Sequence, residues 1–289
     1  MRGLLLMLLA FFIFAAVDTM AKFLTQTLHP IQVVWFRQFG LLVAVLFLLA
    51  RNGVSILRTA HPKLQLTRGA LAGCSAATFI FSVSFVPLAD AIAITFVAPF
   101  LVTVLGALVL REPVGIHRWS AVLVGLAGTL IVIRPGFGAF HPAMLGVVAA
   151  AAFFAIRQIV SRALSSSDRT ITTVAYTALT SSAVLTPPLL MVWQWPSTGQ
   201  QIALLAGIAV LAGLGEFTLI KALEVGEAAA IAPTQYTMLL WGTLYGWLVF
   251  HQLPDLWTWI GALIIVGSGL YTLQRERLAA RRRAAARAP

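Results

Sequence analysis

Apolar runs long enough to cross a bilayer follow one another along almost the whole chain. A hydrocarbon core about 30 Å thick is spanned by roughly 20 residues of α-helix. Charges, prolines, glycines and polar clusters divide the sequence into ten such runs: 4–23, 31–50, 68–86, 90–110, 118–134, 143–161, 171–193, 201–221, 228–250 and 256–273. They lack β-barrel alternation, and only helices or closed barrels satisfy their backbone hydrogen bonds in lipid. The sequence therefore predicts an all-α polytopic membrane protein with ten transmembrane helices.

Composition narrows the function classes further. Hydrophobic residues make up 60% of the chain and charged residues 10%, against about 25% charged residues in soluble domains. The single cysteine, Cys74, excludes an intrachain disulfide, and the five histidines lack the HExxH spacing of a zinc site. No phosphate-binding loop is present. We therefore expect no metal, no cofactor, no catalytic residues and no use of ATP.

The basic residues indicate the orientation of the chain. With the N-terminus inside, sixteen of the twenty lysines and arginines fall in cytoplasmic segments, as the positive-inside rule requires. Both termini are then cytoplasmic, the first run is a retained helix rather than a signal peptide, and the protein is a multi-pass inner-membrane protein. The arginine-rich residues 275–289 are expected to lie against anionic lipid rather than nucleic acid.

The two halves of the sequence resemble each other. Residues 96–133 align with residues 236–273 without a gap. The same offset sets related residues opposite each other: Gly106 and Gly246, Glu112 and Gln252, Trp119 and Trp259, Asp18 and Gln158, and Lys22 and Arg162. Five helices per half means that the second half enters the membrane in the opposite direction, an arrangement typical of transporters with alternating access. We predict two inverted five-helix repeats, residues 1–136 and 141–274, followed by the basic cytoplasmic tail 275–289.

Two segments carry a family resemblance. ADAIAITFVAPFLV…LREP ends the fourth run, and AAAIAPTQY…LLWGTLYGWLVFHQLP ends the ninth. With ten runs in two halves, the chain resembles the EamA-type transporters of the drug/metabolite transporter superfamily. That resemblance implies ten helices around a central cavity and transport of a small organic solute, such as an amino-acid derivative or an S-adenosylmethionine-like, riboflavin-like or drug-like molecule. The chain departs from the family at Gln252, where a glutamate matching Glu112 is usual.

One buried carboxylate singles out the first helix. At 1.5 Å per residue, Asp18 in the first run and Arg37 in the second lie at a similar depth. A charge in the bilayer needs a partner or a function, so we predict that Asp18 and Arg37 pair facing the cavity. The alternative is a structural ion pair without substrate contact. Lys22, one turn beyond Asp18, is expected to extend to the membrane interface as an anchor.

The other polar, aromatic and proline residues within the runs complete the candidate site. The predicted cavity residues are Asp18, Arg37, Thr95, Phe96, Gln158, Tyr176, Gln235, Tyr236 and Trp241. Pro99 and Pro233 are predicted to kink helices at a gate, because proline frees a backbone carbonyl. Lipid-facing aromatic residues and packing kinks are the alternative. Asp18 or Glu216 is the candidate for proton coupling, with Lys221 as a neutralising neighbour of Glu216, whereas Arg157 either faces the cavity or extends to the interface.

Secondary transport of a small organic metabolite is therefore the predicted function. An intramembrane enzyme or a non-transporting membrane scaffold is the alternative. The enzyme would need a nucleophile–base pair or a metal-ligand cluster at one depth, and the sequence does not suggest one. The expected partners are a small-molecule substrate and the lipid bilayer, without nucleic acid, and the protein is expected to be a monomer or a homodimer.

Overall fold

A computed structural model describes residues 2–112, 114–135, 140–164, 168–225 and 232–285. No strand occurs in these ranges. The helices are α1 (Arg2–Leu24), α2 (Pro30–Asn52), the 3₁₀ helix η1 (Val54–Leu57), α3 (Pro62–Val83), α4 (Leu88–Thr95), α5 (Ala98–Val109), α6 (Ile116–Ile133), α7 (Ala143–Leu164), α8 (Thr170–Val192), α9 (Gly199–Val225), the 3₁₀ helix η2 (Ala232–Tyr236), α11 (Thr237–Phe250) and α12 (Leu256–Ala285).

Nine segments within the described ranges are long and apolar enough to cross a membrane. One of them is Leu88–Val109, which α4 and α5 form together. The ninth predicted run, 228–250, which is not among these nine segments, contains η2 and the 14-residue α11, and its first four residues lie outside the described ranges. Large apolar side chains such as Leu5, Phe47 and Met191 are more than half exposed, as expected for surfaces that face lipid. The chain is an all-helical, multi-pass membrane protein.

Helix boundaries follow from local chemistry. Pro30 begins α2, where proline lacks an N–H that would be unsatisfied in any case, and the Nδ1 atom of His29 accepts a hydrogen bond from the backbone N–H of Ile31. Pro62 begins α3 in the same way. α3 therefore starts before the predicted run at residue 68, which places Arg68 inside the helix.

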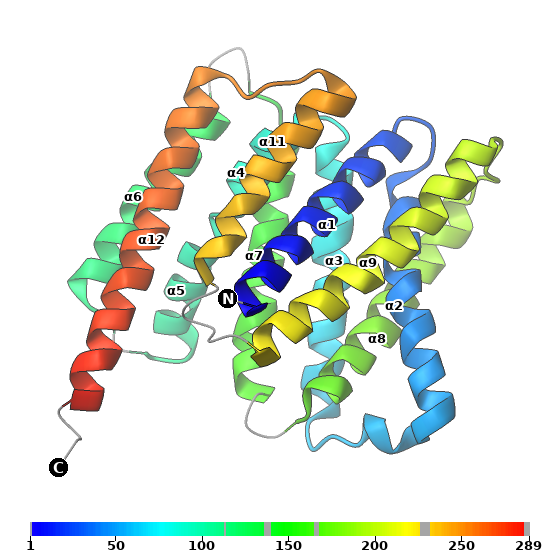
Figure 1. Cartoon of the computed structure of the whole chain (residues 1–289), viewed down its shortest axis with the longest axis horizontal. Helices are drawn as coiled ribbons and strands as arrows, with labels where there is room; N and C mark the ends of the chain where they lie inside the picture. Colours follow the sequence, from blue (N-terminus) through cyan, green and yellow to red (C-terminus); the bar gives the residue numbers. More distant parts are fainter. Residues whose placement is uncertain (1, 113, 136–139, 165–167, 226–231, 286–289) are drawn as a thin grey trace.

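The helices pack in layers that interleave the two halves of the sequence. α1 lies between α9 and α11, and α3 lies against α7 and α8. α6 and α12 pack on each other as a pair at one edge of the bundle (Figure 1). The buried core draws on both halves, including Val17, Ile80, Val147, Ile208 and Ile265. Neither half has a core of its own, because the main helix pairs join one half to the other.

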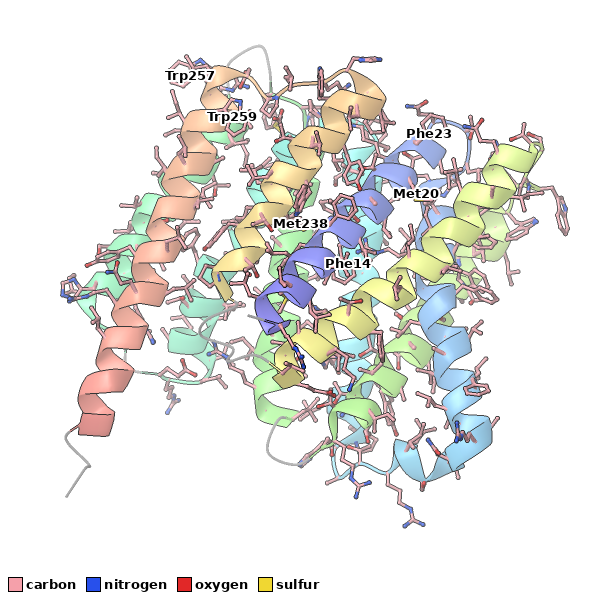
Figure 2. All side chains as sticks on the ribbon, viewed as in Figure 1. Phe14, Met20, Phe23, Met238, Trp257 and Trp259 are labelled. Atoms are coloured by element: carbon pink, nitrogen blue, oxygen red, sulfur yellow. The ribbon has the colours of Figure 1, made fainter. Side chains whose placement is uncertain are left out.

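Glycines allow the closest of these helix contacts. A Cβ atom at Gly215 of α9 would lie 2.8 Å from a ring carbon of Phe14, and one at Gly207 would lie 2.7 Å from the methyl carbon of Met20. Phe14 and Met20 are labelled on α1 in Figure 2. Small residues let membrane helices approach closely, so these glycines set the distance between α1 and α9.

The α6–α12 pair offers a direct test of such packing. A Cβ atom at Gly261 of α12 would lie 2.7 Å from the carbonyl oxygen of Gly128 on α6. Gly261→Ala should therefore destabilise the protein by about 1–3 kcal/mol, the usual effect of overpacking, and lower its thermal unfolding midpoint in detergent. Gly267→Ala on the same helix is the matched control, because no described neighbour lies within 4 Å. Equal midpoints for the two variants would contradict the prediction.

Candidate functional site

A buried ion pair joins α1 and α2. The Nη1 atom of Arg37 lies 3.0 Å from the Oδ1 atom of Asp18, and the side chains are 22% and 2% exposed respectively. The two helices are consecutive, joined by a short turn, so residues at similar depth meet across them. The pairing predicted from depth is confirmed. Leaving either charge alone would be costly, because a buried charge without its partner loses solvation without compensation.

Further side-chain hydrogen bonds join α2, α3, α7 and α8. The Nε2 atom of Gln38, next to Arg37, donates to the Oγ atom of Ser181 on α8 at 3.0 Å. Arg68 of α3 donates from Nε to the Oγ atom of Ser161 on α7 at 2.7 Å, and from Nη1 to Thr177 on α8. A polar layer therefore connects α1, α2, α3, α7 and α8 within the membrane-spanning part of the fold.

Arg157 and Glu216 have fewer partners than the groups above. The guanidinium of Arg157 on α7 stacks on the Phe154 ring at 4.7 Å, and its buried Nε atom has no hydrogen-bond partner in the described residues. Glu216 of α9 interacts electrostatically with Arg157 and Arg68. Within the described residues it forms no direct ion pair. Arg157 is therefore turned toward the protein interior.

Lys221 does not neutralise Glu216. Its Nζ atom lies 2.7 Å from the Oε2 atom of Glu224, one turn further along α9. That part of the sequence interpretation was wrong, because a lysine on a helix reaches carboxylates three or four residues away in either direction. Glu216 instead interacts electrostatically with Arg157 and Arg68.

Aromatic rings from the α4–α5 junction and from η2 contact each other. α4 ends at Thr95 and α5 starts at Ala98, with Pro99 in its first turn; Pro233 lies in η2, directly before α11. The rings of Phe96 and Tyr236, one at each interruption, have centroids 5.1 Å apart. Pro99 therefore lies at the junction of α4 and α5, and Pro233 lies in the 3₁₀ helix that leads directly into α11.

The remaining predicted cavity residues are scattered. Trp241 stacks edge-on against Phe12 at 5.2 Å, and its Nε1 atom has no partner in the described residues. Thr95 donates to the carbonyl oxygen of Ile92 in its own helix. Gln158 lies beside Arg157 on α7, and Gln235 beside Tyr236 in η2.

Tyr176 points elsewhere. Its hydroxyl donates to the carbonyl oxygen of Leu57 in η1 at 3.3 Å, so the structure does not bring it to the Asp18–Arg37 pair. The segment after α2 supplies this partner, and the helix pattern of the sequence did not indicate where that segment would lie.

Lys22 is not an interfacial anchor. Its side chain is 7% exposed, donates to the carbonyl oxygen of Val86, and lies 3.5 Å from the Oε1 atom of Gln252 and 5.2 Å from the Phe250 ring centre. The prediction failed because the loop between α3 and α4 and the end of α11 cover this end of α1. Lys22 instead joins the two halves of the sequence.

Arg68, Gln38 and Ser181 were missed by the sequence analysis. The predicted run began at residue 68, which placed Arg68 at its cytoplasmic edge, whereas α3 begins at Pro62. Pro62, a residue favoured in the first helical turn, was the signal that could have corrected it. Gln38 and Ser181 carry no charge, and nothing in their local sequence distinguishes them from other polar residues in these helices.

Two pockets lie away from the polar layer. One of about 320 Å³ is lined by Ser55, Ile56, Arg58, Asp168, Arg169, Ile171 and Thr172. Hydrogen bonds from Thr59 and Gln65 hold the pKa of Asp168 below its ordinary value, so this carboxylate secures the segment after α2. The second, an apolar groove of about 240 Å³, lies between α11 and α12. Among the described residues no group of three histidine, cysteine, aspartate or glutamate side chains could hold a metal ion.

Comparisons with known proteins agree with this architecture. An S-adenosylmethionine uptake transporter of Rickettsia bellii is 29% identical over 92% of this chain and 91% of its own length. A riboflavin transporter of Vibrio cholerae is 33% identical over 98% of this chain and 96% of its own length. A pseudopaline exporter of Pseudomonas aeruginosa is 28% identical over 91% of this chain and 93% of its own length.

A solved crystal structure shares the fold. It covers 96% of this chain and 98% of its own, with a TM-score of 0.64 and 20% identity. The EamA-like transporter family matches residues 1–134 and 141–273. The chain therefore belongs to the EamA-like transporter family and is a multi-pass inner-membrane transporter of a small metabolite.

Proposed function

We propose that this protein moves its solute by alternating access around the polar layer that contains Asp18 and Arg37. The observation that carries this proposal is the ion pair itself, which is nearly fully buried on Asp18 and lies within helices long and apolar enough to span a membrane. Charges at that depth are expensive and mark solute or ion pathways. Cavity roles for the aromatic residues, gate roles for Pro99 and Pro233, and proton coupling through Asp18 or Glu216 belong to the same proposal.

An inverted repeat supports alternating access. Exchanging the two halves converts the α1–α9 contact into the α7–α3 contact, and the α2–α9 contact into the α8–α3 contact; all four are main contacts of the fold. Arg111 and His251, which correspond in the two halves, have the same left-handed φ of 53°. The next residue in each case donates its N–H to the carbonyl oxygen of Gly106 or Gly246 at 3.1 Å.

We therefore infer ten membrane spans in two five-helix units, residues 1–136 and 141–274, with both termini cytoplasmic. The ten spans count α4 with α5 as one and η2 with α11 as another. Trp193, Trp195 and Trp257, each at least 36% exposed, would lie at the outer interface, where tryptophan is enriched. The basic tail 275–289 would lie on the cytoplasmic side.

Two charged residues that interact electrostatically with Arg68 of the polar layer favour a zwitterionic solute. Arg157 offers a cation and Glu216 an anion, and neither is committed to a direct ion pair in the described residues. α7 and α9 both pack on central helices, α3 and α1 respectively. A solute with a carboxylate and a cationic group would give Arg157 and Glu216 one ion-pair partner each. S-adenosylmethionine, the solute named for the Rickettsia relative, has both groups, whereas riboflavin has neither a carboxylate nor a cationic group.

Counterflow in proteoliposomes tests the function. Vesicles loaded with unlabelled S-adenosylmethionine should accumulate the labelled compound above equilibrium without ATP, and protein-free vesicles should not. Riboflavin and an amino-acid derivative are the comparison solutes. Conversion of a solute to a product without counterflow of any of the three would reject transport and favour an intramembrane enzyme.

A further inference from the structure

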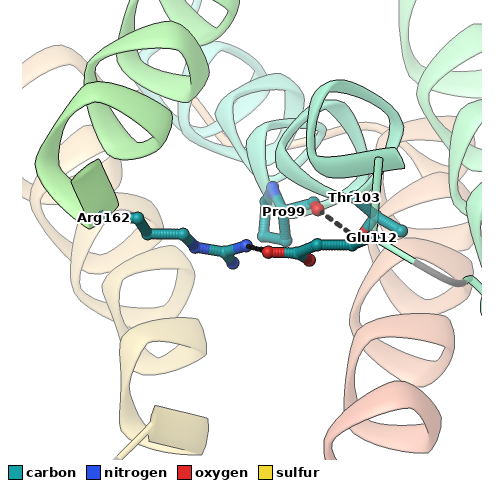
Figure 3. Close-up of polar contacts among 4 residues, drawn as sticks. All are labelled: Pro99, Thr103, Glu112 and Arg162. Atoms are coloured by element: carbon teal, nitrogen blue, oxygen red, sulfur yellow. Dashed lines mark hydrogen bonds and ion pairs between the residues drawn. The ribbon is translucent and has the colours of Figure 1, made fainter. Parts of the chain in front are cut away.

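Two contacts close opposite ends of the bundle at corresponding positions of the two halves. At one end the Nη1 atom of Arg162, near the end of α7, lies 3.1 Å and 3.3 Å from the two carboxylate oxygens of Glu112, just beyond α5 (Figure 3). At the other end the Nζ atom of Lys22, near the end of α1, lies 3.5 Å from the Oε1 atom of Gln252, just beyond α11. In each case a cation at the end of the first helix of one half meets an oxygen at the end of the fourth helix of the other.

The backbone beneath the two contacts is the same. Glu112 and Gln252 each follow a residue with φ of 53° and bond to a glycine carbonyl six residues earlier. Above Glu112 the helix is interrupted beside Pro99, whose carbonyl oxygen accepts a hydrogen bond from Thr103 at 3.0 Å (Figure 3). In both halves the oxygen-bearing side chain therefore leaves the backbone at the same turn, and in the first half this turn follows a segment that is interrupted between α4 and α5.

The contacts differ in chemistry and in burial. Arg162 and Glu112 form a charged pair whose side chains are 50% and 39% exposed. Lys22 is 7% exposed and meets a neutral amide; its ammonium also donates to the carbonyl oxygen of Val86 and interacts electrostatically with Asp90. Both contacts have an ionised donor and are therefore charge-assisted; the Arg162–Glu112 contact adds an ionised acceptor, but solvent weakens that exposed pair.

We propose that Arg162–Glu112 and Lys22–Gln252 are matched latches that open in turn during transport. Opening the first separates α7 from α5, and opening the second separates α1 from α11; both helix pairs are in contact in this structure. This inference rests on the proposed alternating access. The side chains at residues 112 and 252 determine which end of the bundle opens more readily. Placing glutamine at 112 and glutamate at 252 should therefore reverse which end opens more readily.

Distances between spin labels measure each end directly. With Cys74 replaced by alanine, cysteine pairs at Ala163 and Val109 report on the Glu112 end, and pairs at Gln26 and Leu253 report on the Gln252 end. All four residues are exposed. Pulsed electron spin resonance in lipid nanodiscs without solute gives the fraction of molecules with a long distance at each end.

Glu112→Gln should raise the long-distance fraction at its own end about two- to fivefold, the range for an exposed ion pair, and lower it at the other end. Gln252→Glu should close its own end by about threefold, because repulsion from Asp90 offsets part of the attraction to Lys22, and open the other end. The double exchange should reverse the preference of the parent protein. Unchanged distances in both variants, or changes confined to the mutated end, would overturn the proposal.

A second pair of variants distinguishes loss of the Arg162–Glu112 contact from a general folding defect. Arg162→Gln should open the Glu112 end as Glu112→Gln does, and Arg162→Lys should open it less, because lysine keeps the charge but loses the planar donor group. Equal opening by both would count against the latch. The measurement needs no solute, so shifted distances without counterflow would reject the transport function alone, and counterflow with unchanged distances would reject the latches alone.

Discussion

Asp18→Asn is expected to reduce initial solute uptake in proteoliposomes by roughly 100-fold, while the protein still inserts and keeps its helical content. Asparagine has nearly the same shape but leaves the guanidinium of Arg37 without its counter-charge. Removing one partner of a buried ion pair costs about 3–5 kcal/mol. We expect the unpaired guanidinium of Arg37 to disturb the polar layer in each conformation of the transport cycle. Uptake within threefold of the parent rate would contradict a cavity role for Asp18.

The variants at Arg37 separate a structural pair from a functional one. The neutral double variant Asp18→Asn with Arg37→Gln removes both charges, so the thermal unfolding midpoint should recover because no charge is left alone. Uptake should not recover if the pair contacts solute. Recovery of both would favour the structural alternative. Thr19→Val is the matched control, because within the described residues the buried Thr19 hydroxyl bonds to Ala15 of its own helix alone. Uptake by this variant should stay close to the parent rate.

Arg157→Gln is expected to weaken binding of S-adenosylmethionine by about 10- to 100-fold, the range for loss of a hydrogen bond to a charged group. Decarboxylated S-adenosylmethionine lacks the carboxylate that Arg157 would hold, so its affinity should change little in this variant. Competition against labelled solute in proteoliposomes gives both affinities. The expected signature is the loss of discrimination between the two compounds.

Glu216→Gln should weaken both compounds by a similar factor, since each keeps a cationic group. Glu224→Gln is the matched control, because Glu224 lies on the same helix but its side chain is 55% exposed and paired with Lys221. Equal losses of affinity in Glu224→Gln and Glu216→Gln would show a general effect of charge on α9.

For Arg157→Gln, equal losses of affinity for S-adenosylmethionine and its decarboxylated form would contradict a contact between Arg157 and the carboxylate.

The broad fold was accessible from sequence because the bilayer imposes few solutions. Apolar runs must be helices of a nearly fixed length, so the predicted ranges and the helices agree within a few residues for α1, α2, α7 and α8. The Asp18–Arg37 pair was accessible for the same reason, since depth follows from residue count in consecutive helices. The match of the two halves rested on the alignment of residues 96–133 with 236–273.

The sequence alone determined the membrane class, the helix positions and the charges that cannot face lipid. The tertiary structure decided which of those charges meet. Lys22 is buried and contacts Gln252 instead of anchoring at the interface. Glu112 pairs with Arg162 of the other half, and Glu216 interacts electrostatically with Arg157. Hydropathy and helix periodicity act along one segment, whereas partner choice depends on which helices pack across the two halves. Those packing choices are fixed by shape at glycines such as Gly215 and Gly261, and a single sequence does not state which surface each glycine will meet.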